Sequence, residues 1–140
     1  MRVSENFILQ EFVGPEVYQK FGDKSMWFID PKIIDIAQLV RNLTHRPVTI
    51  NNWHNQGHYK ESGLRSMTTK TGAKYSQHKY GRAIDIKVDG MNVQEVYDVI
   101  MTNIDLFRAA GLTTIEDIEK TPTWIHLDVR FNNNELQIVE

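Results

Sequence analysis

The chain has 140 residues, a length that suits one domain with its own hydrophobic core. Its formal net charge of −2 argues against general electrostatic binding to nucleic acid or to an anionic membrane surface. It has no cysteine, which excludes disulfides, thiolate metal ligands and thiol catalysis. Any transition-metal site must therefore use His, Asp or Glu.

The N-terminal residues 1–12 include Glu5 and Glu11 and lack a long apolar run, so they do not resemble a secretory signal. No segment approaches the roughly 18 apolar residues that a membrane-spanning helix needs. We therefore expect the chain to be made and retained in the cytoplasm unless another system releases it. Residues 4–24 mix aromatic and acidic side chains and are expected to form short helical turns.

The first regular element is a helix that begins after Asp30, because Asp is a good N-cap and Pro31 suits the first helical position. Apolar residues then recur at helical spacing between residues 33 and 43. The sequence His-Arg-Pro at residues 45–47 ends this helix.

A short strand pattern at residues 48–52 precedes a polar segment, residues 53–77, that is rich in Gly, Ser, Thr and Lys. This segment predicts a long loop, and such loops in compact domains are often functional. His54 and His58 stand in it among Asn, Gln and Gly, which disfavour a helix. We expect this part of the loop to line a cleft rather than to hold a second metal.

Two later segments, residues 83–88 and 124–131, alternate between apolar and polar side chains as half-buried strands do. Between them, residues 92–95 resemble a capping box that opens a helix with an apolar face. Residues 136–139 predict a final edge strand. Helices that flank several short strands indicate an α+β fold, with residues 1–140 forming a single domain.

The polar sides of the two predicted strands carry candidate metal ligands. Asp85 lies opposite in phase to the apolar Ile84 and Ile86, so it points away from the core. In the second strand, His126 and Asp128 share the polar side. If the two strands belong to one sheet, Asp85 and His126 can meet over its non-core face.

His78 precedes the first of these strands and supplies a third candidate ligand. Gly81 permits an unusual turn, which could bring His78 back over Asp85, and the small Ala83 leaves room there. With His126, two imidazoles and one carboxylate make a zinc site with an open fourth position, where zinc acidifies water. The alternative is a hydrogen-bonded structural cluster without metal.

Five residues stand in the S-x-H-x-x-G-x-A-x-D pattern of the M15 peptidase family: Ser76, His78, Gly81, Ala83 and Asp85. Residues 124–128 resemble the family motif that supplies the last histidine ligand, and residues 6–12 resemble the opening of many small members. The family includes zinc D-alanyl-D-alanine carboxypeptidases and phage L-alanyl-D-glutamate endolysins. The resemblance implies a hedgehog/D-Ala-D-Ala peptidase fold, with a small antiparallel sheet, flanking helices and a Zn²⁺ cofactor held by His78, Asp85 and His126.

The same resemblance implies a zinc peptidase that hydrolyses peptide bonds in bacterial peptidoglycan stem peptides. It implies a monomer without a nucleic-acid or membrane partner, delivered by a phage lysis system or carried in a virion. Residues 62–66 resemble the family's S-G-x-R segment, whose arginine contacts the substrate or polarises the scissile carbonyl. This carries a catalytic role to Arg65, for which the alternative is a surface salt bridge.

The position of the general base departs from the family pattern. The base is usually an acid three residues before the last histidine ligand, and Thr123 stands there. Asp128 could take the catalytic role or could instead hold the histidine in place. Glu116, Asp117 and Glu119 could also reach in. A catalytically weak or inactive M15-like metal-binding domain, serving in cell-wall binding or in a virion, is therefore the alternative function.

Overall fold

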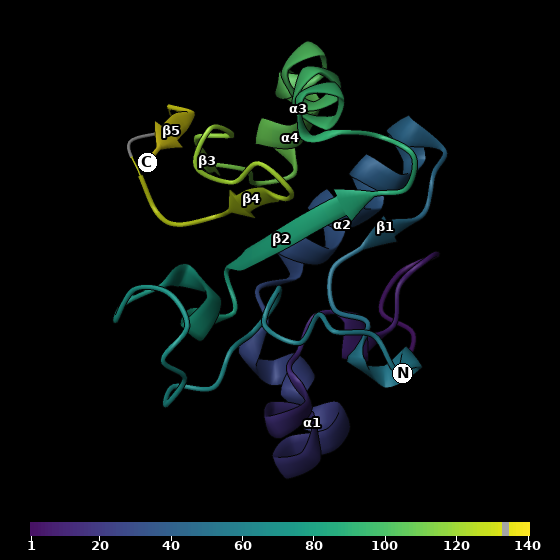
Figure 1. The fold of residues 1–140 in the computed structure, drawn as a ribbon, viewed down its shortest axis with the longest axis vertical. Helices are drawn as coiled ribbons and strands as arrows, with labels where there is room; N and C mark the ends of the chain where they lie inside the picture. The colour runs from purple at the N-terminus through teal and green to yellow at the C-terminus, as the bar shows by residue number, and fades with distance from the viewer. Residues whose placement is uncertain (133–134) are drawn as a thin grey trace.

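The computed structural model describes residues 1–132 and 135–140 and has the α+β fold that the sequence predicts (Figure 1). Within these residues, five strands form one sheet in the order β1-β2-β4-β3-β5. The strands are β1 (Val48–Thr49), β2 (Ala83–Val88), β3 (Thr114–Glu116), β4 (Ile125–Asp128) and β5 (Gln137–Val139).

Four α-helices accompany the sheet in this part of the chain: α1 (Pro15–Phe21), α2 (Pro31–Thr44), α3 (Val93–Thr102) and α4 (Ile104–Ala109). Short 3₁₀ turns complete the described secondary structure: η1 (Leu9–Glu11), η2 (Gly22–Phe28), η3 (Trp53–Asn55) and η4 (Gln77–Tyr80). Among the residues described, no helix has the length and apolar character needed to cross a membrane.

The caps that the sequence predicts are present at both long helices. Asp30 accepts a hydrogen bond from the backbone N–H of Lys32 at 3.0 Å and so begins α2. The helix ends at His45, which adopts a left-handed conformation with φ of 55°. Asn92 and Glu95 form the predicted capping box at the start of α3.

The structure differs from the predicted antiparallel sheet in strand direction and length. β5 pairs with β3 in parallel, so the sheet is mixed. β1 is shorter than predicted because the next backbone N–H groups bond outside the sheet, Asn51 to the carbonyl of Glu11 and Asn52 to that of Tyr59. The strand β3 was not predicted, and it fills the position between β4 and β5.

The sheet buries one face against helices, and α2 lies behind β2 in Figure 1. The core contains residues of α2 and α3. Apolar residues of β2, β3 and β4 pack into the same core: Ile84, Ile86, Ile115, Ile125 and Leu127. Complete burial of one such side chain stabilises the fold by about 1.5–3 kcal/mol. The opposite face of the same strands is left for polar side chains.

Candidate metal centre

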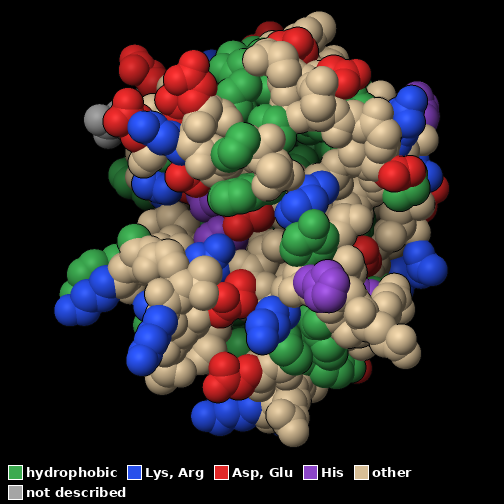
Figure 2. Space-filling model, viewed as in Figure 1, with side chains coloured by type: hydrophobic (Ala, Val, Ile, Leu, Met, Phe, Trp, Pro, Cys, Tyr) green, Lys and Arg blue, Asp and Glu red, His purple; other side chains and the backbone are tan. Residues whose placement is uncertain are grey.

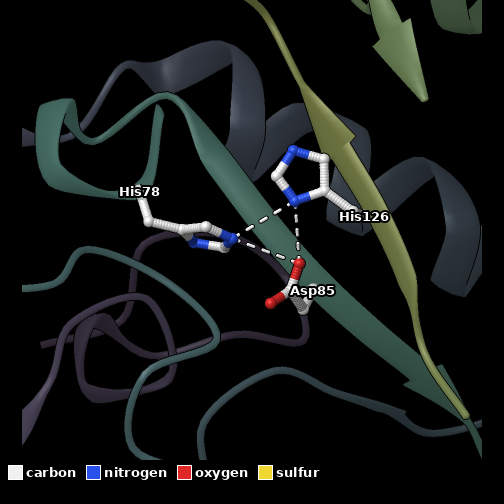
Figure 3. Close-up of side chains that lie close together, drawn as sticks. All are labelled: His78, Asp85 and His126. Carbon is white, nitrogen blue, oxygen red and sulfur yellow. Dashed lines mark hydrogen bonds and ion pairs between the residues drawn. The ribbon is translucent and has the colours of Figure 1, made fainter. Parts of the chain in front are cut away.

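Three side chains converge on the polar face of the sheet (Figure 3). His78 Nε2 lies 3.1 Å from Asp85 Oδ1 and 3.2 Å from His126 Nδ1. His126 Nδ1 lies 2.9 Å from the same carboxylate oxygen. All three residues are buried. The predicted ligands are therefore together in space.

The triangle of donor atoms has the size that a zinc ion requires. Tetrahedral zinc with bonds of about 2.0–2.2 Å separates its ligand atoms by about 3.3 Å. The separations of 2.9 to 3.2 Å between the three donors come close to this value. Two imidazole nitrogens and one carboxylate oxygen are also a donor set that catalytic zinc sites use. These residues therefore fit a zinc ion in size and chemistry.

The outer nitrogens of both imidazoles are fixed by hydrogen bonds. His78 Nδ1 donates to the carbonyl oxygen of Gly63 at 2.9 Å, and His126 Nε2 donates to Asp128 Oδ2 at 2.8 Å. Both acceptors lack a proton to give, so the inner nitrogens carry lone pairs in the neutral rings. The two inner nitrogens, His78 Nε2 and His126 Nδ1, are then both acceptors, and at 3.2 Å apart they cannot hydrogen-bond to each other. A cation between them, or added protons, would satisfy both.

The electrostatic environment favours positive charge among the donors. Burial alone lowers the pKa of His126, but hydrogen bonds to Asp128 and Asp85 and their negative charges outweigh it and raise the pKa to about 9. Burial alone would raise the pKa of Asp85, yet hydrogen bonds from His126 and His78 hold it well below the usual range. The negative potential that holds a proton on His126 also attracts a metal ion.

The sheet register places two of the three donors. β2 and β4 are antiparallel neighbours, and Asp85 pairs directly with His126. Directly opposed residues place their side chains on the same face, with Cβ atoms about 4.5–5.5 Å apart. The prediction that Asp85 and His126 meet over one sheet face is therefore confirmed.

The third donor is positioned by the turn before β2. Ser76 caps η4 by accepting a hydrogen bond from the backbone N–H of His78 at 3.3 Å. Gly81 ends this turn with φ of 67°, and a Cβ there would lie 1.8 Å from the carbonyl oxygen of Phe28. Only glycine fits both constraints, so the bend that brings His78 over Asp85 depends on Gly81.

The segment 62–65 supports the same centre through its backbone and its arginine. The carbonyl of Ser62 accepts from the backbone N–H of Asp85 at 2.8 Å. Arg65 Nη2 lies 3.3 Å from Asp85 Oδ2, while Arg65 Nε donates to the carbonyl of Glu61 at 2.6 Å. The side chain of Arg65 is only 9% exposed, so its pairing with Asp85 is a buried salt bridge rather than a surface one.

Asp128 lies behind His126 and does not line the pocket over the three donors. Its side chain is fully buried, and Oδ2 accepts from both His126 and Arg130. Oδ1 accepts from the backbone N–H and Nε of Arg130, at 3.2 and 2.8 Å. His126 and Arg130 also hold the pKa of Asp128 below its usual value against the effect of burial. This geometry suits a residue that orients His126.

A pocket of about 490 Å³ opens over the three donors. Figure 2 shows histidine side chains at the bottom of a hollow, with acidic and basic side chains beside them. Arg65, Glu116, Trp124 and Arg130 line this pocket together with the donors. The pocket is therefore open, with charges of both signs around the donor atoms.

Several residues singled out by the sequence lie outside this pocket. Thr123 borders a different, smaller pocket beside α3. His54 packs edge-on against Trp53, at 5.8 Å between ring centroids, and neither it nor His58 lines the pocket over the donors. The expectation that this part of the loop lines the cleft is therefore wrong for the pocket described. Among residues 1–132 and 135–140, no second group of three possible metal ligands is present.

Comparison of the chain with known protein families, curated proteins and solved structures found no significant match.

Proposed function

We propose that the chain is a zinc-dependent peptidase that hydrolyses peptide bonds in bacterial peptidoglycan stem peptides. The observation that carries the proposal is the convergence of three donor atoms from His78, Asp85 and His126 in an open pocket. The resemblance of the surrounding motifs to the M15 family supports the substrate class. A phage lysis system or a virion would bring such an enzyme to the cell wall.

A bound zinc ion would supply Lewis-acid chemistry, since it acidifies water and polarises a carbonyl. The residues of the chain supply binding and orientation. His78 and His126 hold their inner nitrogens toward the pocket through the bonds to Gly63 and Asp128. Arg65 lines the pocket with a fixed positive charge and can stabilise negative charge on the carbonyl oxygen as it develops.

The test combines zinc binding with turnover. We expect the purified chain, stripped of metal and titrated with zinc, to bind one equivalent. The zinc-loaded chain is expected to release new amino groups from purified peptidoglycan, and a chelator is expected to stop this release. His78→Ala removes one of the three donors, so its zinc affinity is expected to fall by more than about 100-fold, beyond the loss typical of residues that only orient ligands.

His45→Ala is the matched control, because His45 caps the end of α2 and is not among the residues that line the pocket. It is expected to bind zinc and to cut peptidoglycan like the unmodified chain. Zinc content of His78→Ala equal to that of the control would contradict the ligand set. A zinc-loaded chain that releases nothing from peptidoglycan would contradict the peptidase function but not the metal site.

A second candidate function has one observation in its favour. Thr123 occupies the position of the family's usual acid, and it borders a pocket other than that of the donors. A metal-binding domain that recognises cell wall or virion partners without cutting them would not need an acid at this position. Zinc-dependent co-sedimentation with intact peptidoglycan, without release of amino groups, would favour this second function.

A further inference from the structure

A row of three polar residues crosses the sheet at the level of the metal centre. Asp85 in β2 pairs with His126 in β4, and β3 runs antiparallel on the other side of β4 with Ile115 opposite Leu127. One further step in this register brings Glu116 beside His126. Because opposed residues point to the same face, Glu116 shares the polar face of the sheet with both ligands.

The contacts of Glu116 leave its carboxylate free to act in the pocket. Glu116 lines the same pocket as the three donors. Within residues 1–132 and 135–140, no hydrogen bond to its side-chain oxygens is present, and its charge acts on Arg65 and Arg130. It therefore has open acceptor positions in the pocket that the donors line, with two arginines nearby.

The other acids near the centre differ from Glu116 in place or in contacts. Glu140 also lines the pocket, but it follows β5, which is separated from β4 and His126 by β3. Asp128 is fully buried, and both of its oxygens are taken by His126 and Arg130. Asp117 accepts from the backbone N–H of Glu119 in the turn after β3, and neither residue lines the pocket. Glu116 is thus distinguished from its neighbours by the sheet register.

We propose that Glu116 is the catalytic residue that transfers the proton in peptide hydrolysis, a role that rests on the peptidase function proposed above. Its carboxylate accepts a proton from the attacking water as the water oxygen bonds to the carbonyl carbon. The resulting carboxylic acid then gives that proton to the leaving nitrogen as the carbon–nitrogen bond breaks. One water is consumed, the carboxylate is regenerated and no redox partner is required.

The first arm of the test locates the side chain without measuring activity. The chain is labelled with ¹³C at glutamate side-chain carboxyls, and the resonance of Glu116 is assigned by its loss in Glu116→Gln. Adding one equivalent of zinc is expected to shift this resonance, because a dication enters the pocket that Glu116 lines. The resonance of Glu119, assigned in the same way, is expected to stay in place. An unmoved Glu116 resonance would overturn the proposal.

The second arm compares turnover and zinc affinity in Glu116→Gln and in the matched control Glu119→Gln, which removes one charge outside the pocket. Glu116→Gln is expected to bind zinc within about threefold of the unmodified chain and to lose at least about 100-fold in kcat, the lower end of what general acid–base catalysis contributes. Glu119→Gln is expected to change neither quantity.

The outcomes separate this proposal from the proposed function. Activity of Glu116→Gln equal to that of the control, in a chain that cuts peptidoglycan, would overturn the role of Glu116 and leave the peptidase function standing. A drop in zinc affinity of more than about tenfold would identify Glu116 as a further metal ligand and overturn its role in proton transfer. A zinc-loaded chain without turnover would overturn the peptidase function itself, and the role of Glu116 with it.

Discussion

The two faces of β2 and β4 carry side chains of opposite kind and place different demands on the sequence. On the core face, Ile84 and Leu127 contribute volume and apolar area, and any side chain of similar size satisfies most of that demand. On the other face, Asp85 and His126 must present particular atoms at separations near 3 Å. The core face therefore sets stability, while the polar face sets chemistry.

The polar face is buried without being apolar. Ala83, Asp85, His126 and Asp128 are all buried, although three of them are ionisable. Each charge is balanced nearby, since Arg65 pairs with Asp85 and Arg130 with Asp128. Burying these polar and charged groups costs stability unless each of them has a partner. Substitutions on this face are therefore expected to affect folding as well as metal binding.

The largest expected effect tests the core face. Ile84→Ala removes a fully buried side chain from the core and is expected to lower the free energy of unfolding by about 2–5 kcal/mol. The zinc affinity of the molecules that remain folded is expected to be unchanged, because the side chain points away from the donors. Urea unfolding of the metal-free chain and zinc titration measure the two quantities.

Ile84→Val is the milder control, with an expected loss of about 0.5–1.5 kcal/mol. A zinc affinity that falls in proportion to stability across these two variants would show that the faces are coupled. The separation of stability from chemistry would then fail.

A smaller effect is expected on the polar face. Asp128→Asn keeps the shape of the side chain but removes the negative charge behind His126. Loss of a carboxylate that orients a histidine ligand is expected to lower zinc affinity by about 10–100-fold. Isothermal titration with zinc checks this value. An affinity equal to that of the unmodified chain would show that His126 is oriented without Asp128.

The long, regular elements and their faces could be predicted from the sequence. The six residues of β2 alternate clearly enough to separate Asp85 from the core, and Asp30 with Pro31 marks the start of α2. The donors meet because β2 and β4 are neighbours, a pairing that the sequence left as a condition and that the structure supplies. These features depend on local patterns of several residues, and such patterns survive in a single sequence.

The short elements could not be predicted, because three residues carry too little pattern. β3 has only three residues, and its place beside β4 depends on pairing with a distant part of the chain. Without that register, Glu116 could not be distinguished from Asp117 and Glu119. The parallel direction of β5 likewise leaves no trace in so short a strand.

The smallest expected effect concerns Thr123, which stands where the resemblance to the M15 family leads us to expect an acid. Its side chain is exposed and borders a pocket beside α3 rather than the donors. Thr123→Ala is therefore expected to change the free energy of unfolding by no more than about 0.5 kcal/mol and to leave zinc affinity and turnover unaltered. Thr123→Glu is the informative companion, because it introduces the acid that the resemblance to the M15 family leads us to expect. If Thr123→Glu raised turnover while Glu116→Gln left turnover unchanged, the turn before β4 would reach the reacting atoms. The assignment of chemistry to the polar face of the sheet would then be wrong. Unaltered turnover in both Thr123 variants, together with the loss expected for Glu116→Gln, would instead place proton transfer on the row formed by Asp85, His126 and Glu116.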